Sequence, residues 1–95
     1  MSDEIQIFHK NIRVFGRVQG VGFRFACRKT AVSYGIKGFV KNLYDGSVYI
    51  EAEGTKAQMN YFIDWCSKGP QYAGIDEVRV TEGNFKNFSH FDITF

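Results

Sequence analysis

The sequence has little of what most catalytic and cofactor-binding motifs require. It contains two cysteines, two histidines and one proline in 95 residues. No GxxxxGKS/T phosphate-binding loop occurs. Gly20 and Gly22 are followed at position 25 by Phe instead of Gly, so the dinucleotide-binding fingerprint is absent as well. His, Cys, Asp and Glu nowhere share the spacing of a metal site. We therefore expect neither a metal nor an organic cofactor.

The few side chains that could act as nucleophiles or bases are not arranged for that chemistry. Neither Cys27 nor Cys66 is followed six residues later by an arginine, as a cysteine phosphatase requires, and no DxD pair suits an aspartyl-phosphate enzyme. Both cysteines lie on the apolar stripes of predicted helices, which favours buried free thiols with neighbouring sulfurs. His9 and His90 are isolated, and we expect each to be a surface or strand residue. No covalent intermediate is therefore expected.

Long hydrophobic runs are missing too. The longest contains only a few residues, so no transmembrane segment is predicted. The N-terminal sequence MSDEIQIFHK is acidic and lacks the apolar core of a signal peptide. With no export signal and two cysteines, we expect a reduced cytoplasmic protein. The 95 residues suit one domain, in which residues 1–9 are expected to be flexible or to add a strand.

Alternating and helical patterns fill the rest of the chain. Strand-like alternation and helix-like spacing of apolar residues predict strands at 12–18, 38–44, 47–53, 78–80 and 91–95 and helices at 23–34 and 55–68. Asp45-Gly46 predicts a hairpin turn, and Thr55 with Gln58 predicts a capping box. On the third strand Glu51 and Glu53 should point outward and be solvated.

The order of these elements indicates the fold. We predict an α+β protein with a ferredoxin-like α/β sandwich (βαββαβ), in which two helices cover one face of a mostly antiparallel sheet that ends in a short final strand. This fold carries enzymes, RNA-binding domains and metal carriers alike, so it does not indicate the function. The function must therefore be inferred from candidate site residues.

The stretch GRVQGVGFR at 16–24 is the first candidate site. A glycine-rich strand-to-helix loop lets backbone N–H groups converge on a phosphate, and Arg24 could grip two of its oxygens. The alternative is a plain turn with an incidental surface arginine. Residues 1–48 carry eight Lys/Arg and three Asp/Glu, which gives +5 and suits an anion, although such an imbalance can also be ordinary solvated surface.

Asn42, near the end of the predicted strand at 38–44, is the second candidate. Asparagine is a poor strand residue, but its amide could hold a water molecule beside a bound phosphate. A parallel pairing of the first strand with a neighbouring strand would bring such a residue next to the glycine loop.

Two motifs in these stretches resemble the acylphosphatase family. The family pattern GxVQGVxFR is matched by Gly16, Val18, Gln19, Gly20, Val21, Phe23 and Arg24. A second pattern, from a glycine-aromatic pair to a closing glycine, is matched by Gly38, Phe39, Val40, Lys41, Asn42, Gly46, Val48 and Gly54. The resemblance extends over about residues 10–95.

The resemblance implies hydrolysis of acyl phosphates to a carboxylate and inorganic phosphate, by Arg24 and Asn42 and without a metal. The phosphate would be bound by Gln19, Gly20, Val21, Gly22, Phe23 and Arg24. Acyl phosphates are then the expected small-molecule partners, with inorganic phosphate or sulfate as competing anions. We expect a monomer with no nucleic-acid or membrane partner.

Two departures and two alternatives accompany this resemblance. Phe39 stands where many members have Trp or Tyr, and Leu43 replaces a common Thr, so a hydroxyl beside Asn42 is missing. The segment KGFVKNLY begins like the aromatic strand of RNA-recognition domains but departs from it at Val40 and Lys41. A regulatory domain that binds an acyl phosphate without turnover is the other alternative. The sequence does not distinguish acetyl phosphate, carbamoyl phosphate and 1,3-bisphosphoglycerate as substrates.

Overall fold

The computed structural model describes residues 5–95, and residues 1–4 lie outside the described part. Its elements in chain order are β1 (Phe8–Arg17), α1 (Phe23–Tyr34), β2 (Lys37–Asn42), β3 (Val48–Gly54), α2 (Lys56–Lys68), β4 (Gly74–Glu82) and β5 (Phe91–Ile93). Every predicted element is present. β1 begins earlier than predicted, so Phe8 and His9 belong to it, while residues 5–7 lie outside any strand. In the described part, no helix has the length and apolarity needed to span a membrane.

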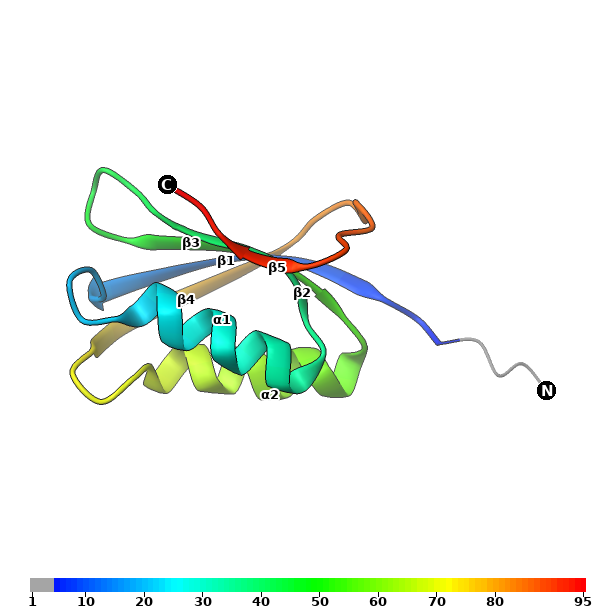
Figure 1. Cartoon of the computed structure of the whole chain (residues 1–95), viewed down its shortest axis with the longest axis horizontal. Coiled ribbons are helices and arrows are strands. Elements are labelled where there is room, and N and C mark those ends of the chain that lie inside the picture. Colours follow the sequence, from blue (N-terminus) through cyan, green and yellow to red (C-terminus); the bar gives the residue numbers. More distant parts are fainter. Residues whose placement is uncertain (1–4) are drawn as a thin grey trace.

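The five strands form one sheet in the order β4-β1-β3-β2-β5. β1 pairs antiparallel with β3 and with β4, β3 pairs antiparallel with β2, and β2 pairs parallel with β5. The ferredoxin-like prediction is confirmed, but the suggested parallel partner of the first strand is wrong, because β3 is inserted between β1 and β2. These two strands still run in the same direction. The loop after β1 and the hairpin after β2 therefore lie at the same end of the sheet (Figure 1).

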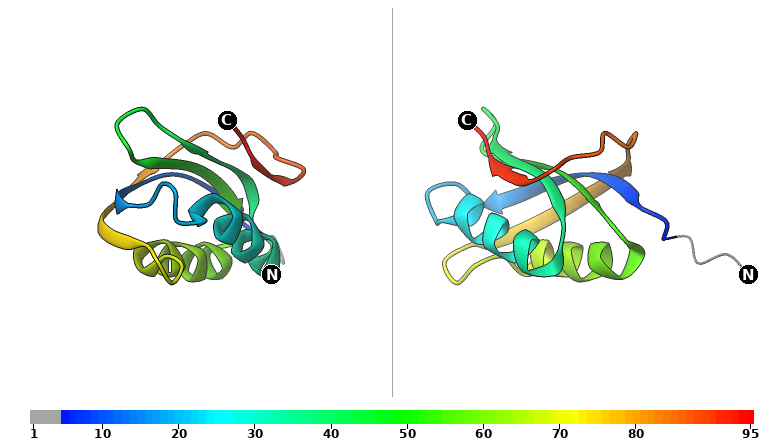
Figure 2. Two further views of the ribbon diagram at one scale, coloured as in Figure 1. Left: turned by 60° about the vertical axis from the view of Figure 1, so that its left-hand side comes forward. Right: turned by 45° about the vertical axis from the view of Figure 1, so that its right-hand side comes forward.

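Both helices cover one face of this sheet (Figure 2). The predicted stripes are the buried ones: α1 buries Phe23, Cys27 and Ala31, and α2 buries Met59, Phe62 and Cys66. These side chains pack on the inward residues of the central strands, among them Ile12, Val14, Val48 and Ile50. The predicted capping box at the start of α2 is also present. The result is a two-layer core that holds the ends of β1 and β2 in fixed positions.

The two cysteines are buried and free, as expected. Burial raises the pKa of the Cys27 thiol, and the proximity of Cys66 raises it further. Burial likewise raises the pKa of the Cys66 thiol. Both groups are therefore neutral at physiological pH and act as small apolar core residues.

The other face of the sheet departs from the prediction. Glu51 and Glu53 point outward as expected but are buried, as is His9, because the segment at 83–90 folds over them. His9 Nδ1 lies 2.7 Å from Glu53 Oε2, and His9 Nε2 lies 3.1 Å from Glu51 Oε1. The expectation of solvated carboxylates is therefore wrong, whereas His9 is a strand residue, as expected. The alternation of apolar and polar residues in β3 correctly predicted the face of the sheet on which Glu51 and Glu53 lie. It did not predict that another segment covers this face.

The covering segment is attached to these carboxylates through its backbone. The amides of Lys86 and Phe88 donate to Glu53 at 2.6 and 2.9 Å, and the Lys86 ammonium donates to Glu51 at 2.7 Å. Burial raises the pKa of Glu53, but the hydrogen bonds from His9 and from the two amides outweigh it and leave that pKa below its ordinary value. This polar cluster fixes the path of the chain into β5.

Candidate active site

Three glycines shape the segment between β1 and α1. A Cβ on Gly16 would lie 2.1 Å from the carbonyl oxygen of Gly74, so a side chain there would collide with β4 at the β-bulge. Gly20 and Gly22 have φ angles of 75° and 77°, which favour glycine, yet a Cβ on either would meet nothing within 4 Å. Their conformation therefore serves the turn, and the space beside them is free for a ligand.

Helix α1 begins directly after this loop without a side-chain cap. Gly22 is the N-cap residue and has no side chain that could accept a hydrogen bond from a backbone amide. The first turn of the helix also contains no acidic residue. The N–H groups of a first turn have no partner within the helix, and the helix dipole places partial positive charge there. The start of α1 is thus electrostatically suited to an anion.

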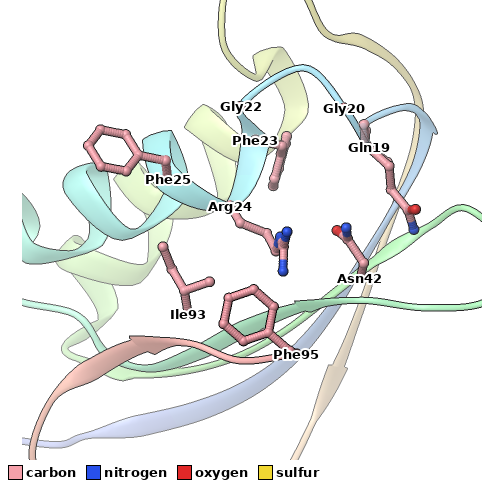
Figure 3. A pocket seen from close by; sticks show the side chains of 10 residues that line it. Gln19, Gly20, Gly22, Phe23, Arg24, Phe25, Asn42, Ile93 and Phe95 are labelled. Atoms are coloured by element: carbon pink, nitrogen blue, oxygen red, sulfur yellow. The ribbon is translucent and has the colours of Figure 1, made fainter.

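Arg24 adds a full positive charge to the same place. Its side chain extends from the first turn of α1 toward Asn42 (Figure 3). The guanidinium Nη1 donates to the carbonyl oxygen of Thr94 at 3.3 Å, and the guanidinium carbon lies 4.9 Å from the centre of the Phe95 ring. The guanidinium therefore lies over an aromatic ring, and these two contacts hold the long side chain in place before any ligand arrives.

Asn42 is the last residue of β2, and its amide faces the same hollow (Figure 3). Its Oδ1 atom is buried and has no hydrogen-bond partner among the described residues. A buried polar atom without a partner is rare and calls for a functional explanation. Asn42 is therefore an acceptor that is directed at the hollow and available to a bound molecule.

The side chain of Gln19 holds the neighbouring hairpin. Its side-chain amide nitrogen donates to the carbonyl oxygens of Leu43 and Ser47, at 2.8 and 2.9 Å. Both donor hydrogens thus hold the β2–β3 hairpin, and only the backbone of Gln19 is left for an anion. Gln19 connects the glycine loop to the hairpin that begins directly after Asn42.

The hairpin turn is braced on its other side by Asp45. This carboxylate accepts from the hydroxyl and the amide of Ser47, at 2.5 and 2.9 Å, and forms an ion pair with Arg13. The Ser47 hydrogen bonds, followed by the Arg13 guanidinium, hold the pKa of Asp45 below its ordinary value. Together with Gln19 these contacts hold the hairpin that begins directly after Asn42.

The predicted site residues meet around one cavity of about 290 Å³, which we call the loop pocket. It is lined by Val18, Gln19, Gly20, Gly22, Phe23, Arg24, Phe25, Asn42, Ile93 and Phe95. Val21 is missing from the lining because its side chain packs on the core. The Phe23 ring is buried as well and lies 5.3 Å from the Trp65 ring, so Phe23 can offer only its amide.

Four residues that line the loop pocket were not among the predicted site residues: Val18, Phe25, Ile93 and Phe95. Phe25, Ile93 and Phe95 contribute apolar walls. Phe25 follows Arg24 directly, so its proximity could have been noticed, but nothing in the sequence connects the strand at 91–93 with the start of α1. A second cavity of about 510 Å³, the hairpin pocket, adjoins through Gln19, Asn42 and Phe95 and is also lined by Lys41, Leu43 and Tyr44.

An uncapped helix start and a guanidinium beside one cavity suit an anionic small molecule. Comparison with known proteins then identifies the family. The family model described as acylphosphatase matches residues 10–93. The chain belongs to the acylphosphatase family. The acylphosphatase of Mannheimia succiniciproducens is 46% identical over 84 residues, which cover 88% of this chain and 91% of that protein. The resemblance inferred from the two motifs is therefore confirmed.

Solved structures of acylphosphatases share the fold. The crystal structure of the Bacillus subtilis acylphosphatase superposes with a TM-score of 0.90 at 33% identity, over 95% of this chain and all of that one. A similar domain also occurs inside a much longer protein. Full-length HypF, in a phosphate- and nucleotide-bound form, matches this whole chain with a TM-score of 0.88 and 34% identity, but the match covers only 13% of HypF.

Proposed function

We propose that this member of the acylphosphatase family hydrolyses the mixed anhydride of acyl phosphates, with Arg24 and Asn42 as the catalytic residues. The observation that carries the proposal is their convergence. An uncapped helix start, a guanidinium and a buried unpartnered amide oxygen line one cavity. Two of these features favour a phosphoryl group, and the third favours a water molecule beside it.

The phosphoryl group would be bound by the backbone amides of residues 19–24 and by the Arg24 guanidinium. Phosphoryl transfer requires positioning and charge stabilisation more than covalent assistance from the protein. The contacts of Arg24 with Thr94 and Phe95 support this role, since a side chain fixed in advance loses little entropy on binding. The same amides and guanidinium would bind inorganic phosphate or sulfate as competing anions.

Asn42 would orient the nucleophile. Its free Oδ1 can accept a hydrogen bond from a water molecule and direct the water oxygen at phosphorus. The water oxygen forms the new bond to phosphorus, and the bond between phosphorus and the acyl oxygen breaks with its electron pair leaving on the carboxylate. The proton of the water passes to a phosphoryl oxygen. The products are a carboxylate and dihydrogen phosphate.

The leaving group explains why no general acid is required. The conjugate acid of the departing carboxylate has a pKa of roughly 4, as for Asp or Glu, so the carboxylate leaves without a proton. No enzyme nucleophile takes part in this scheme, and no metal ion is involved. In the described residues no cluster of three or more His, Cys, Asp or Glu side chains is suited to hold a metal ion. We further propose a cytoplasmic monomer.

A measurement of turnover distinguishes the proposed enzyme from a domain that only binds acyl phosphates. The purified protein is incubated with acetyl phosphate and with benzoyl phosphate, and release of inorganic phosphate is followed beside a calorimetric titration with phosphate. We expect multiple turnovers and competitive inhibition by phosphate. Binding without release would instead favour a regulatory domain that binds an acyl phosphate without turnover.

A further inference from the structure

The walls of the loop pocket differ on the two sides of Arg24. Gln19 and Asn42 lie on one side of the guanidinium, and Phe25 and Ile93 lie on the other (Figure 3). Phe95 lies under the guanidinium itself. The pocket thus has a polar side, where the amide of Asn42 is available, and an apolar side formed by the three residues Phe25, Ile93 and Phe95.

The direction of the reaction assigns a role to the apolar side. In phosphoryl transfer the attacking and the leaving oxygens lie roughly in line through phosphorus. If Asn42 holds the water, as proposed above, the acyl group must leave from the opposite side of the phosphoryl group. The acyl group therefore lies toward Phe25 and Ile93 and away from the hairpin.

The charges of the pocket restrict what this acyl group can be. Among the described residues that line the loop pocket, Arg24 is the only charged one. Its charge is already directed at the phosphoryl group, so the lining of the loop pocket offers no second cation for a negative charge on the acyl side. Lys41 lines the hairpin pocket, which lies on the side of the attacking water and not on the side of the acyl group. An uncharged apolar acyl group fits these walls best.

We propose, on the basis of the function proposed above, that Phe25, Ile93 and Phe95 form an acyl-binding subsite that selects bulky apolar or aromatic acyl phosphates, and that Phe25 is its specificity-determining residue. Phe25 is suited to this role because it is 72% exposed and so is not needed in the core. A large apolar side chain that remains exposed at the rim of a cavity gains contact area only when a ligand covers it.

The test compares two substrates in matched variants. For wild type, Phe25→Ala, Phe25→Leu and the control Tyr44→Ala, the ratio of kcat/KM for benzoyl phosphate to kcat/KM for acetyl phosphate is measured, and circular dichroism confirms folding. Tyr44 is also an exposed aromatic residue, but it lies on the hairpin side. We expect Phe25→Ala to lower the ratio by about tenfold, Phe25→Leu to lower it less, and Tyr44→Ala to leave it unchanged.

Two other results would overturn the subsite. If Phe25→Ala kept the wild-type ratio, the apolar side would have no part in selection. If Tyr44→Ala lowered the ratio instead, the acyl group would lie in the hairpin pocket. In both cases the enzyme still turns over acyl phosphates, so the proposed function survives. A wild-type protein that hydrolyses neither substrate would refute the proposed function and the subsite together.

Discussion

Replacing Asn42 by alanine should separate turnover from binding, because only the proposed contact with water is removed. Its Oδ1 has no partner among the described residues, so the substitution breaks no hydrogen bond that holds the fold. Loss of one positioning contact in an active site costs on the order of 10²-fold in rate. We therefore expect kcat to fall by at least about 10²-fold while the inhibition constant of phosphate stays close to that of wild type. Asn42→Asp should be no better, since a carboxylate repels the phosphoryl group.

Arg24 provides the contrast that makes the result interpretable. Its guanidinium would meet phosphoryl oxygens both in the ground state and in the transition state. Loss of a phosphate-clamping arginine costs about 10³ to 10⁵ in rate, or about 4 to 7 kcal/mol. Arg24→Ala should accordingly abolish turnover and weaken phosphate binding together. Arg24→Lys should restore little, because an ammonium cannot bind two oxygens in one plane.

The assay is the same for all four variants. Release of phosphate from an acyl phosphate gives kcat, inhibition by inorganic phosphate gives its inhibition constant, and thermal unfolding checks that each variant is folded. If Asn42→Ala retained most of the wild-type kcat, the role of Asn42 in orienting water would be wrong. If it lost phosphate affinity as severely as Arg24→Ala, Asn42 would be a phosphate ligand instead.

Three further predictions follow from the same features. Titration with phosphate should shift the amide NMR signals of Gly20 and Gly22 most, and shifts centred on Lys68 would mean that the loop is only a turn. Activity should survive prolonged treatment with EDTA and should not rise with added magnesium; loss of activity that zinc or magnesium restores would contradict the metal-free mechanism. Because the folded-state pKa of Glu53 lies below its unfolded value of about 4.3, its contribution to stability is present above that pH and is lost as the pH falls through the folded pKa. Urea unfolding between pH 6 and pH 3 should therefore show a shallower loss of stability in Glu53→Gln than in wild type, and equal slopes would refute the assignment.

Local patterns predicted most of the fold. The helices, their buried stripes and the hairpin depend on neighbours within a few residues, so spacing, the capping box at Thr55 and the turn at Asp45 were sufficient. The candidate site residues Arg24 and Asn42 stand out because a glycine-rich loop and an asparagine in a strand are unusual within their own segments. To predict that both residues lie at one cavity, the order of the strands in the sheet would also have been needed.

Contacts between distant segments could not be predicted in the same way. Alternation placed Glu53 on the outer face but could not reveal that the segment at 83–90 covers it. Gln19 was assigned to the phosphate through its backbone, but no local pattern shows that its side chain donates to the hairpin. Phe95 beneath Arg24 depends on the parallel pairing of β5 with β2, which no local signal specifies.

The position of β1 between two later strands also has a kinetic consequence. Lys10 of β1 pairs with Glu82 of β4, 72 residues further along the chain. Such pairings give the sheet a high contact order, and the entropy of closing long loops is lost before the contacts can compensate for it. Arg24 and Asn42 meet only once β3 has entered between β1 and β2. Binding at the proposed phosphate site would therefore report the completion of folding, which helix content alone does not report.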